Sequence, residues 1–241
     1  MATEETSGLE VRGLQKRYGN LVAVQDLSFF VRPGETVGLL GPNGAGKTTT
    51  LLCIAGMVRP SGGEIRWNGQ LLGLERGRSV TLIAETPEVY AMLTVWEHLV
   101  FVARACRLRE GWQRHAQELL ERLGLSEQRD TLGEALSKGM RQKTLIAASV
   151  LAGTPALLLD EPMIGLDPRG QRELRGMLEE LRREGIAVLI STHLLESAEA
   201  ICDRVVILKQ GRLVAEGAVD DLRQRRGSEK SLEDAFLEIT Q

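Results

Sequence analysis

The stretch GPNGAGKT, Gly41–Thr48, constrains the fold of this chain more than any other feature of the sequence. It fits the pattern G-x-x-x-x-G-K-[ST], follows the short apolar run TVGLL, and precedes GKTTTLLCIAGMV, which has helical spacing. In such a strand–loop–helix unit, glycines let backbone N–H groups face phosphate oxygens, and the helix N-terminus adds the positive end of its dipole. A chance match in a chain this long has a probability on the order of one in a hundred. The sequence therefore predicts a nucleotide-binding α/β domain.

Two side chains of this stretch have specific expected roles. Lys47 is expected to reach the β- and γ-phosphates, and the Thr48 hydroxyl is expected to ligate Mg²⁺. The expected nucleotide-binding residues of the loop are Gly41, Pro42, Asn43, Gly44, Ala45, Gly46, Lys47, Thr48 and Thr49.

Two further apolar runs end in polar residues. ALLLDEP, Ala156–Pro162, ends in two carboxylates, and ligands of open α/β sheets bind beyond such strand ends. Asp160 suits the Mg²⁺ shell, and Glu161 could activate the attacking water as a general base. In AVLISTHLLE, His193 could contact the γ-phosphate and hold Glu161 or the water. The alternatives are an acidic strand end that faces solvent and a structural or surface histidine.

The layout along the chain is α/β with a helical interruption. The first third is rich in strand residues, and residues from about 87 to 152 are mainly helical, with one helix capped at Thr94. ALLLDEP and AVLIST, separated by a charged helix, indicate parallel strands with helical crossovers. DRVVILKQGRLVAEG predicts a hairpin around Gln210–Gly211, and SLEDAFLEIT predicts a terminal helix capped by Ser231.

Composition narrows the classes of function. The chain has 241 residues, 43% of them hydrophobic and 26% charged, which is enough for a well-buried core. The formal net charge of −3 gives no attraction to nucleic acid, and no nucleic-acid partner is expected. The cysteines, Cys53, Cys106 and Cys202, form no CxxC pair and suggest no zinc site or disulfide framework. The acidic N-terminus is no signal peptide, and no run of about 18 apolar residues occurs, so we expect a soluble protein.

Several single residues remain open between two interpretations. Tyr18 could stack on adenine, and a half-buried strand tyrosine is the alternative interpretation from its position. Asp167 in GLDP could be no more than a helix N-cap. His98 and His115 lie in amphipathic segments and are interpreted as structural or surface residues.

Taken in order, these segments resemble the motifs of the ATPase subunit of an ABC transporter. The matches are Tyr18 to the aromatic loop, GPNGAGKTT to Walker A, LSKGM to the signature, LLLDEP to Walker B, GLD to the D-loop and His193 to the switch histidine. The resemblance covers nearly the whole chain. It implies an α/β fold with a P-loop ATPase core, an antiparallel β subdomain and an inserted α-helical subdomain. Residues 1–241 would form one domain, with the helical subdomain at about 87–152.

The resemblance also implies how ATP is used. Two nucleotide-binding domains of this family pair head to tail, and each ATP, with Mg²⁺, lies between Walker A of one chain and the signature of the other. Ser137, Lys138, Gly139 and Asp167 would contact the ATP held across the interface between the two chains. Hydrolysis by Glu161 and His193 would then release the dimer.

The implied partners are a transmembrane permease on a separate chain and a second copy of this chain or a paralogous ATPase subunit. SKGMRQ is similar to the form found in an ABC-2-like branch with separate permeases that are often exporters. The protein would then lie peripherally on the cytoplasmic face of the inner membrane. The segment VYAMLTVWEHL would receive the permease, but core packing is an equal alternative for Tyr90, Leu93 and Trp96.

Three positions depart from the family pattern. Lys138 and Met140 replace the second Gly and the Gln of LSGGQ, and Lys138 could add a cation near phosphate. Glu85 stands where the loop entering the helical subdomain normally carries Gln, and it can still reach Mg²⁺ or water. Ile164 replaces the D-loop Ser, which removes one hydroxyl from the dimer interface.

Two other functions compete with transport. One is a soluble ABC ATPase that acts on nucleic acid or the ribosome, although such proteins usually carry coiled-coil insertions, zinc modules or a second ATPase domain. The other is an ATP-binding regulatory subunit with little turnover, for which Glu85 and Ile164 are the only support.

Overall fold

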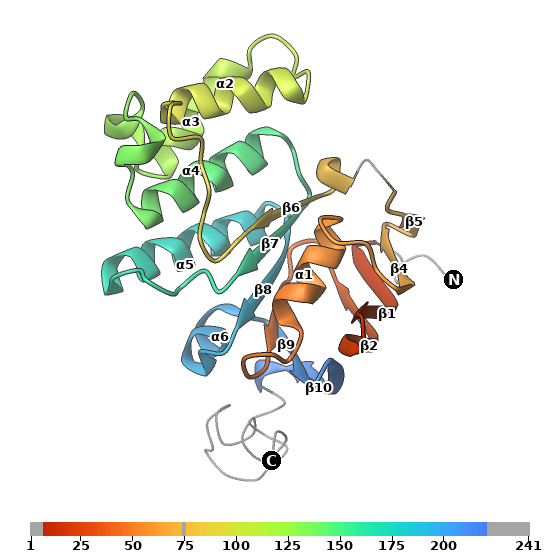
Figure 1. The fold of residues 1–241 in the computed structure, drawn as a ribbon. Helices are drawn as coiled ribbons and strands as arrows, with labels where there is room; N and C mark the ends of the chain where they lie inside the picture. Colours follow the sequence, from red (N-terminus) through yellow and green to blue (C-terminus); the bar gives the residue numbers. More distant parts are fainter. Residues whose placement is uncertain (1–6, 74–75, 221–241) are drawn as a thin grey trace.

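The computed structural model describes residues 7–73 and 76–220 of the chain. The predicted terminal helix SLEDAFLEIT and its cap Ser231 lie outside the described residues. Within them, two β-sheets and a set of helices form the layers shown in Figure 1.

The central sheet has six strands in the order β10-β9-β3-β8-β7-β6. Its parallel strands are β3 (Thr36–Leu40), β6 (Val80–Ile83), β7 (Ala156–Asp160), β8 (Ala187–Thr192) and β9 (Arg204–Lys209). The edge strand β10 (Arg212–Ala218) pairs antiparallel with β9. The prediction of parallel strands is therefore confirmed. The predicted hairpin is also confirmed, because Gln210 and Gly211, both at positive φ, form the two-residue turn.

The second sheet is antiparallel and has four strands in the order β2-β1-β4-β5. They are β1 (Leu9–Tyr18), β2 (Leu21–Val31), β4 (Gly62–Trp67) and β5 (Gln70–Leu71). This sheet accounts for the strand-rich first third of the sequence.

Six α-helices complete the described fold: α1 (Lys47–Ala55), α2 (Val95–Ala105), α3 (Trp112–Arg122), α4 (Lys138–Leu151), α5 (Pro168–Arg183) and α6 (Leu195–Ile201). Short 3₁₀ turns occur at Arg76–Arg78, Ser126–Gln128 and Gly133–Ala135. Figure 1 shows α2, α3 and α4 grouped on the side of the central sheet away from the antiparallel sheet. Thr94 caps α2 as expected, because its side chain accepts from the Glu97 N–H in a reciprocal capping box.

The strand β6 is a difference from the sequence interpretation, which predicted no strand between the first third and ALLLDEP. Val80–Ile83 is only four residues long and pairs in parallel with β7. Its apolar residues, VTLI, show no helical or strand period over so short a run, so only the pairing with β7 defines the strand.

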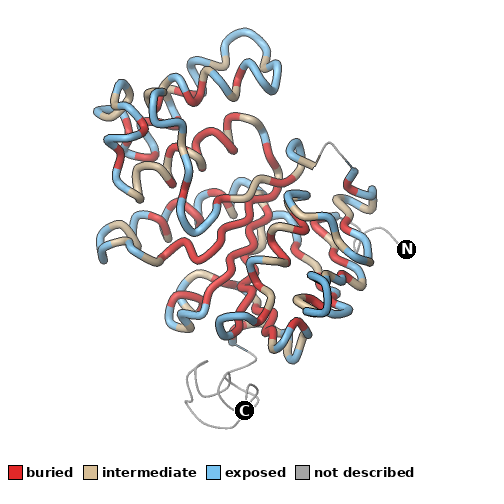
Figure 2. Tube along the Cα trace, viewed as in Figure 1, coloured by how far each residue is buried: buried red, intermediate tan, exposed pale blue. Residues whose placement is uncertain are grey.

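The core has two main parts, one on each face of the central sheet. Leu158 and Leu189 pack towards α1 and the antiparallel sheet, whereas Leu157, Leu159 and Val188 pack towards α2–α5. Successive strand residues point to opposite faces, which explains why continuous apolar runs form these strands. Figure 2 shows the buried residues concentrated along them.

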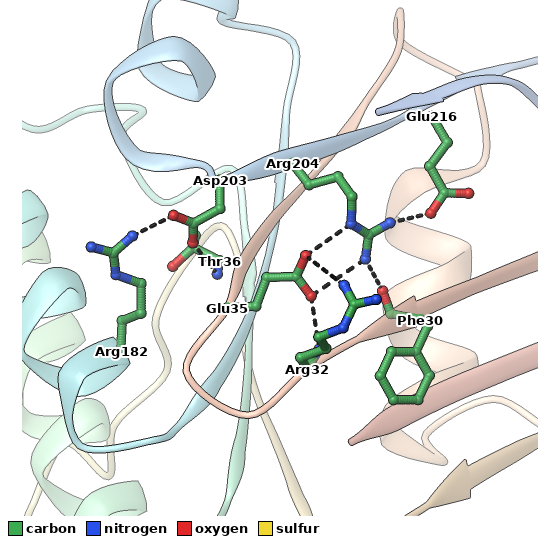
Figure 3. Close-up of polar contacts among 8 residues, drawn as sticks. All are labelled: Phe30, Arg32, Glu35, Thr36, Arg182, Asp203, Arg204 and Glu216. Atoms are coloured by element: carbon green, nitrogen blue, oxygen red, sulfur yellow. Dashed lines mark hydrogen bonds and ion pairs between the residues drawn. The ribbon is translucent and has the colours of Figure 1, made fainter. Parts of the chain in front are cut away.

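A cluster of charged side chains joins the two sheets at the edge opposite the strand ends that carry the predicted site. Arg204 donates to Glu35, to Glu216 and to the Phe30 carbonyl at the end of β2 (Figure 3). Beside it, Asp203 accepts from the Thr36 N–H at 2.9 Å and from Arg182 of α5. Charge-assisted hydrogen bonds of this kind are stronger than neutral ones, so they help to fix the start of β3.

Candidate functional site

The predicted catalytic residues lie where neighbouring parallel strands end. Gly41 follows β3, Glu161 follows β7 and His193 follows β8, and these three strands are adjacent in the sheet. Because carboxyl ends of parallel strands meet at one edge, residues 120 and 32 positions apart in sequence come together here.

The phosphate-binding loop depends on glycine at two positions. Gly44 and Gly46 adopt φ of 82° and 100°, which L side chains rarely adopt. A Cβ at Gly46 would also collide with the Ala23 carbonyl oxygen. Helix α1 begins at the next residue, so the N–H groups of its first turn have no acceptor within the helix. The loop can therefore surround a phosphate group with N–H donors.

Lys47 is the buried cation of the site, with 6% of its surface exposed. Its Nζ donates to the Gly41 carbonyl at 2.8 Å and to the Pro42 carbonyl at 3.4 Å. It also lies 3.5 Å from Glu161 Oε1. A buried charge requires compensation, and here the loop's own carbonyls and a carboxylate provide it.

Glu161 is buried and lies between two nitrogen groups. Its Oε1 is 2.9 Å from His193 Nδ1 in addition to the 3.5 Å contact with Lys47. Its backbone is in the left-handed region, with φ of 46°, and its N–H points to Ser191. The His193 side chain is 39% exposed, so the pair is accessible from solvent on the histidine side. The geometry brings Glu161 and His193 together as predicted.

Asp160 and Thr48 fit the Mg²⁺ ion that the family implies. Asp160 is buried at the end of β7, and its Oδ1 accepts a hydrogen bond from the Ser191 hydroxyl. Thr48 is exposed in the first turn of α1. Mg²⁺ in nucleotide sites is usually held by one or two protein oxygens together with substrate phosphates and water. The described residues hold no group of three or more His, Cys, Asp or Glu side chains that could bind a metal.

The LSKGM segment forms a second helix start, apart from the phosphate-binding loop. Ser137 is the N-cap of α4, and its Oγ accepts from the Met140 N–H at 3.3 Å. Ser137 is exposed, and Gly139 is partly exposed. A cavity of about 910 Å³ lies between α4 and α5, is lined by residues 137–140 and 165–167 among others, and includes no residue of the phosphate-binding loop.

Lys138 does not lie free beside this helix start. Its Nζ donates to the Ile164 carbonyl at 2.6 Å, and its side chain passes close to Gly165. Two of the three departures from the family pattern therefore contact each other within one chain. This contact joins α4 to the loop between β7 and α5.

Asp167 has the capping role that the sequence left open. It is the N-cap of α5, and its Oδ1 accepts from the Gly170 N–H at 2.7 Å. The side chain is exposed on the same cavity as Ser137.

The remaining predicted residues lie at the margins. Tyr18 is the last residue of β1 and is 45% exposed, with Lys16 Nζ 4.6 Å from its ring centroid. Tyr18 is thus a strand residue with about half of its surface accessible. Glu85 is exposed two residues beyond β6, at the same edge of the sheet as the other strand ends.

The segment before and within α2 divides into packed and exposed aromatic residues. Trp96 stacks on Trp112 with ring centroids 5.7 Å apart and lies under Arg129, so it packs within the helical group. Tyr90 is 58% exposed and contacts Phe101 edge to face. His98 is buried and structural as expected, because its Nε2 accepts from the Tyr90 N–H.

Ser191 is a site residue that the sequence interpretation did not select. It lies on β8 with no exposed surface and contacts both Asp160 and Glu161. The signal was present in the polar ending of AVLIST, but the interpretation used only His193 from that segment.

These features define a P-loop nucleotide-binding protein whose buried lysine and strand-end carboxylates are those of an ATPase. A family model described as "ABC transporter" matches residues 24–164. The chain belongs to the ABC transporter family. It is 34% identical to the linearmycin resistance ATP-binding protein LnrL of Bacillus subtilis (strain 168), over 96% of this chain and 74% of that protein. It is 37% identical to the ABC-type transporter ATP-binding protein EcsA of the same organism, over 96% of each.

The fold agrees with this assignment. A solved structure titled "Structure of ATP binding subunit of ABC transporter" is similar with a TM-score of 0.88 at 38% identity, covering 98% of this chain and 100% of that one. The predicted family, fold class and ATPase activity are confirmed: the chain is an ATP-binding subunit that couples ATP hydrolysis to transport. Among its described residues, none of the helices is both long and apolar enough to cross a membrane.

Proposed function

We propose that this subunit closes with a second ATPase chain around two ATP molecules and drives export through a permease on a separate chain. In the simplest assembly the second chain is another copy of this one. The observation that carries the proposal is the separation of two complementary helix starts: Lys47 begins α1 beside the carboxylates, whereas Ser137 caps α4 on another surface.

The separation matters because one chain holds only part of an ATP site. The α1 side supplies N–H groups, Lys47 and the carboxylates, but the exposed hydroxyl of Ser137 and the start of α4 line the cavity between α4 and α5. Head-to-tail pairing would bring the α4 start of one chain to the γ-phosphate on the other. Asp167, exposed on that cavity, would then lie in the interface.

The chain's own residues suggest how hydrolysis proceeds. When ATP binds, Lys47 would leave its ion pair with Glu161 and contact the β- and γ-phosphates instead. Glu161 would then be free to take a proton from the attacking water. His193, hydrogen-bonded to the same carboxylate, would orient it. Asp160 and Thr48 would hold Mg²⁺, with Glu85 at the sheet edge as a further contact to Mg²⁺ or water. When bound, Mg²⁺ neutralises charge on the transferred phosphoryl group.

Tyr18, exposed at the end of β1, is proposed to stack on the adenine ring. Pro42, Asn43, Ala45 and Thr49 would complete the loop around the phosphates. The described 3₁₀ turns and helices between residues 87 and 152 would act as the helical subdomain that carries the LSKGM segment.

The permease is proposed to dock on exposed apolar residues of that helical part. Tyr90, Met92, Phe101 and Leu132 are 58%, 77%, 49% and 38% exposed, respectively. Exposed apolar side chains gathered on one part of a surface commonly mark a protein interface. The name of LnrL, a resistance protein, supports export, and this docking would place the subunit peripherally on the cytoplasmic face of the membrane.

The proposal is tested with Glu161→Gln, which removes the base and keeps the shape. Turnover should fall by about 10²- to 10⁴-fold, while an ATP-bound dimer accumulates on size exclusion. His115→Gln, on an exposed part of α3, serves as a control and should leave both properties unchanged. A Glu161→Gln chain that hydrolyses ATP normally would remove Glu161 from its role.

The transport partner is tested separately, by solubilising membranes and purifying the tagged subunit. It should co-purify with the product of a neighbouring permease gene, and replacing Tyr90 and Met92 by Ser should release that partner while leaving ATP binding intact. A subunit that stays partnerless and retains nucleic acid would contradict the transport proposal and favour the nucleic-acid alternative.

A further inference from the structure

We propose that Ser191 is a positioning residue for ATP hydrolysis, which holds the metal-binding Asp160 and the general base Glu161 in a fixed relation to each other. The inference rests on the proposed roles of those two carboxylates. It concerns a residue on β8 that touches neither phosphate nor water in the proposed scheme.

Ser191 forms hydrogen bonds to both Asp160 and Glu161 and so bridges the two residues. Its hydroxyl donates to Asp160 Oδ1 and accepts from the Glu161 N–H at 3.1 Å. The same N–H also lies 3.0 Å from the Ser191 carbonyl oxygen. One buried residue thus binds the side chain of the first carboxylate and the backbone of the second. Because its own surface is fully buried, no water competes for these bonds.

The backbone of Glu161 explains why such a bridge is needed. Its φ of 46° lies in the left-handed region, which is unfavourable for a residue with a side chain. Surrounding contacts must therefore hold the peptide in place. The bonds from its N–H to Ser191 hold it at the point where the chain leaves β7, and this orientation directs the side chain towards Lys47 and His193.

The hydrogen bond from the Ser191 hydroxyl orients the Asp160 side chain. A hydrogen bond to one oxygen of a carboxylate fixes the rotation of the group and leaves the other oxygen for a metal ligand. Outer partners of metal ligands commonly change metal affinity or activity by 10- to 100-fold when they are removed. Ser191 occupies that position for Asp160.

Residues at the end of β8 and just beyond it consequently contact both members of the acidic pair. Ser191 binds Asp160 and the Glu161 backbone, and His193, two residues further on, binds the Glu161 side chain. A shift of β8 relative to β7 would change both contacts together. Of the two residues, Ser191 is fully buried, whereas the His193 side chain is partly exposed.

The test compares Ser191→Ala with Ser191→Thr, which keeps a hydroxyl. Ser149→Ala serves as the matched control, because Ser149 is also buried and donates to a single carbonyl, that of Leu145, within α4. Two readouts are needed: the steady-state kcat and KM for ATP, and the thermal stabilisation of the single chain by ADP at increasing Mg²⁺ concentration and in EDTA.

Ser191→Ala should lower kcat by about 10- to 100-fold and raise the Mg²⁺ concentration for half-maximal stabilisation by about tenfold. Stabilisation by ADP in EDTA should be unchanged, since the phosphate-binding loop is intact. Ser191→Thr should restore the Mg²⁺ midpoint, and Ser149→Ala should leave it at the wild-type value.

The proposal is overturned if Ser191→Ala leaves the Mg²⁺ midpoint unchanged, or if the Ala and Thr variants shift it equally, because the hydroxyl would then not be the cause. The ADP measurement needs only one chain. Its outcome is therefore independent of whether the proposed dimer forms or a substrate is transported, so the two proposals can fail separately.

Discussion

The edge of the central sheet and the start of α4 differ in how far their polar groups are buried and bonded within the chain. At the sheet edge, Lys47, Glu161 and Ser191 are buried and bonded to one another or to the loop. At the start of α4, Ser137 is exposed above a cavity of about 910 Å³. Both regions offer a helix N-terminus, but only the first is already enclosed by its own chain.

Under the proposed pairing, this contrast separates the part of the site that folding determines from the part that assembly would complete. Contacts at the sheet edge are made by strands that must pair for the chain to fold, so they exist before any ligand binds. The start of α4 has the same chemistry without an enclosing wall. Under the proposed pairing, the subunit would bind nucleotide alone and would need a second chain to complete the site.

The largest effect is expected for a substitution in the enclosed region at the sheet edge. Lys47→Ala removes the buried cation and should weaken ATP binding by at least about 30-fold, because truncating one partner of a buried charge pair typically costs ~2–5 kcal/mol. Isothermal titration of the single chain with ATP checks this. Lys143→Ala, which removes an α4 lysine paired with Glu173 instead, is the control and should bind ATP normally. Unchanged affinity in Lys47→Ala would mean that phosphate binds elsewhere.

A smaller effect is expected at the open region. Lys138→Met keeps most of the aliphatic side chain but removes the hydrogen bond to the Ile164 carbonyl, which is worth about 1 kcal/mol. Turnover should fall about fivefold, with ATP affinity of the single chain unchanged. Enzyme kinetics and titration on the same preparation separate the two. If Lys138→Met loses ATP affinity as Lys47→Ala does, the two regions are not distinct in function.

The smallest effect concerns Glu173 of α5, which forms an ion pair with Lys143 of α4. Hydrogen bonds from Lys143 and then Arg169 lower the pKa of Glu173. A carboxyl group with a lowered pKa stabilises the fold above its unfolded-state pKa, and this contribution is lost as pH falls through the folded-state value. Because the side chain is 39% exposed, Glu173→Gln should cost less than ~1 kcal/mol at neutral pH.

Thermal melts of wild type and Glu173→Gln across pH check the sign of this effect. The difference between them should be present at pH 7 and shrink towards acid pH. A difference that grows on acidification would show that the ion pairs do not act as described. ATP turnover is expected to stay near the wild-type value.

Much of the fold was predictable because it depends on local patterns. GPNGAGKT between an apolar run and a helical run predicted β3, the loop and α1, and Gln210–Gly211 predicted the hairpin of β9 and β10. The roles proposed for Asp160, Glu161 and His193 followed from strand ends. The structure places the latter two in contact.

The parts that sequence analysis missed depend on contacts between distant residues. Val80–Ile83 becomes a strand only through pairing with β7. The contact of Lys138 with the Ile164 carbonyl, 26 residues away, was not predicted. Ser191 meets Glu161 from 30 residues away through adjacent strands. These contacts depend on the order of strands in the sheet, and no hydrophobic period or local motif around these residues indicates that order.

The central claim is that the start of α4 completes an ATP site on another chain. The most direct test combines Ser137→Arg with Glu161→Gln in one chain. Size exclusion in the presence of ATP measures its oligomeric state, and titration with ATP measures its affinity. Arginine at this exposed N-cap should block the partner's γ-phosphate by its bulk. The double variant should therefore bind ATP with normal affinity but remain monomeric, whereas Glu161→Gln alone forms the ATP-bound dimer. A double variant that still dimerises with ATP, or that loses ATP binding as a single chain, would contradict the claim.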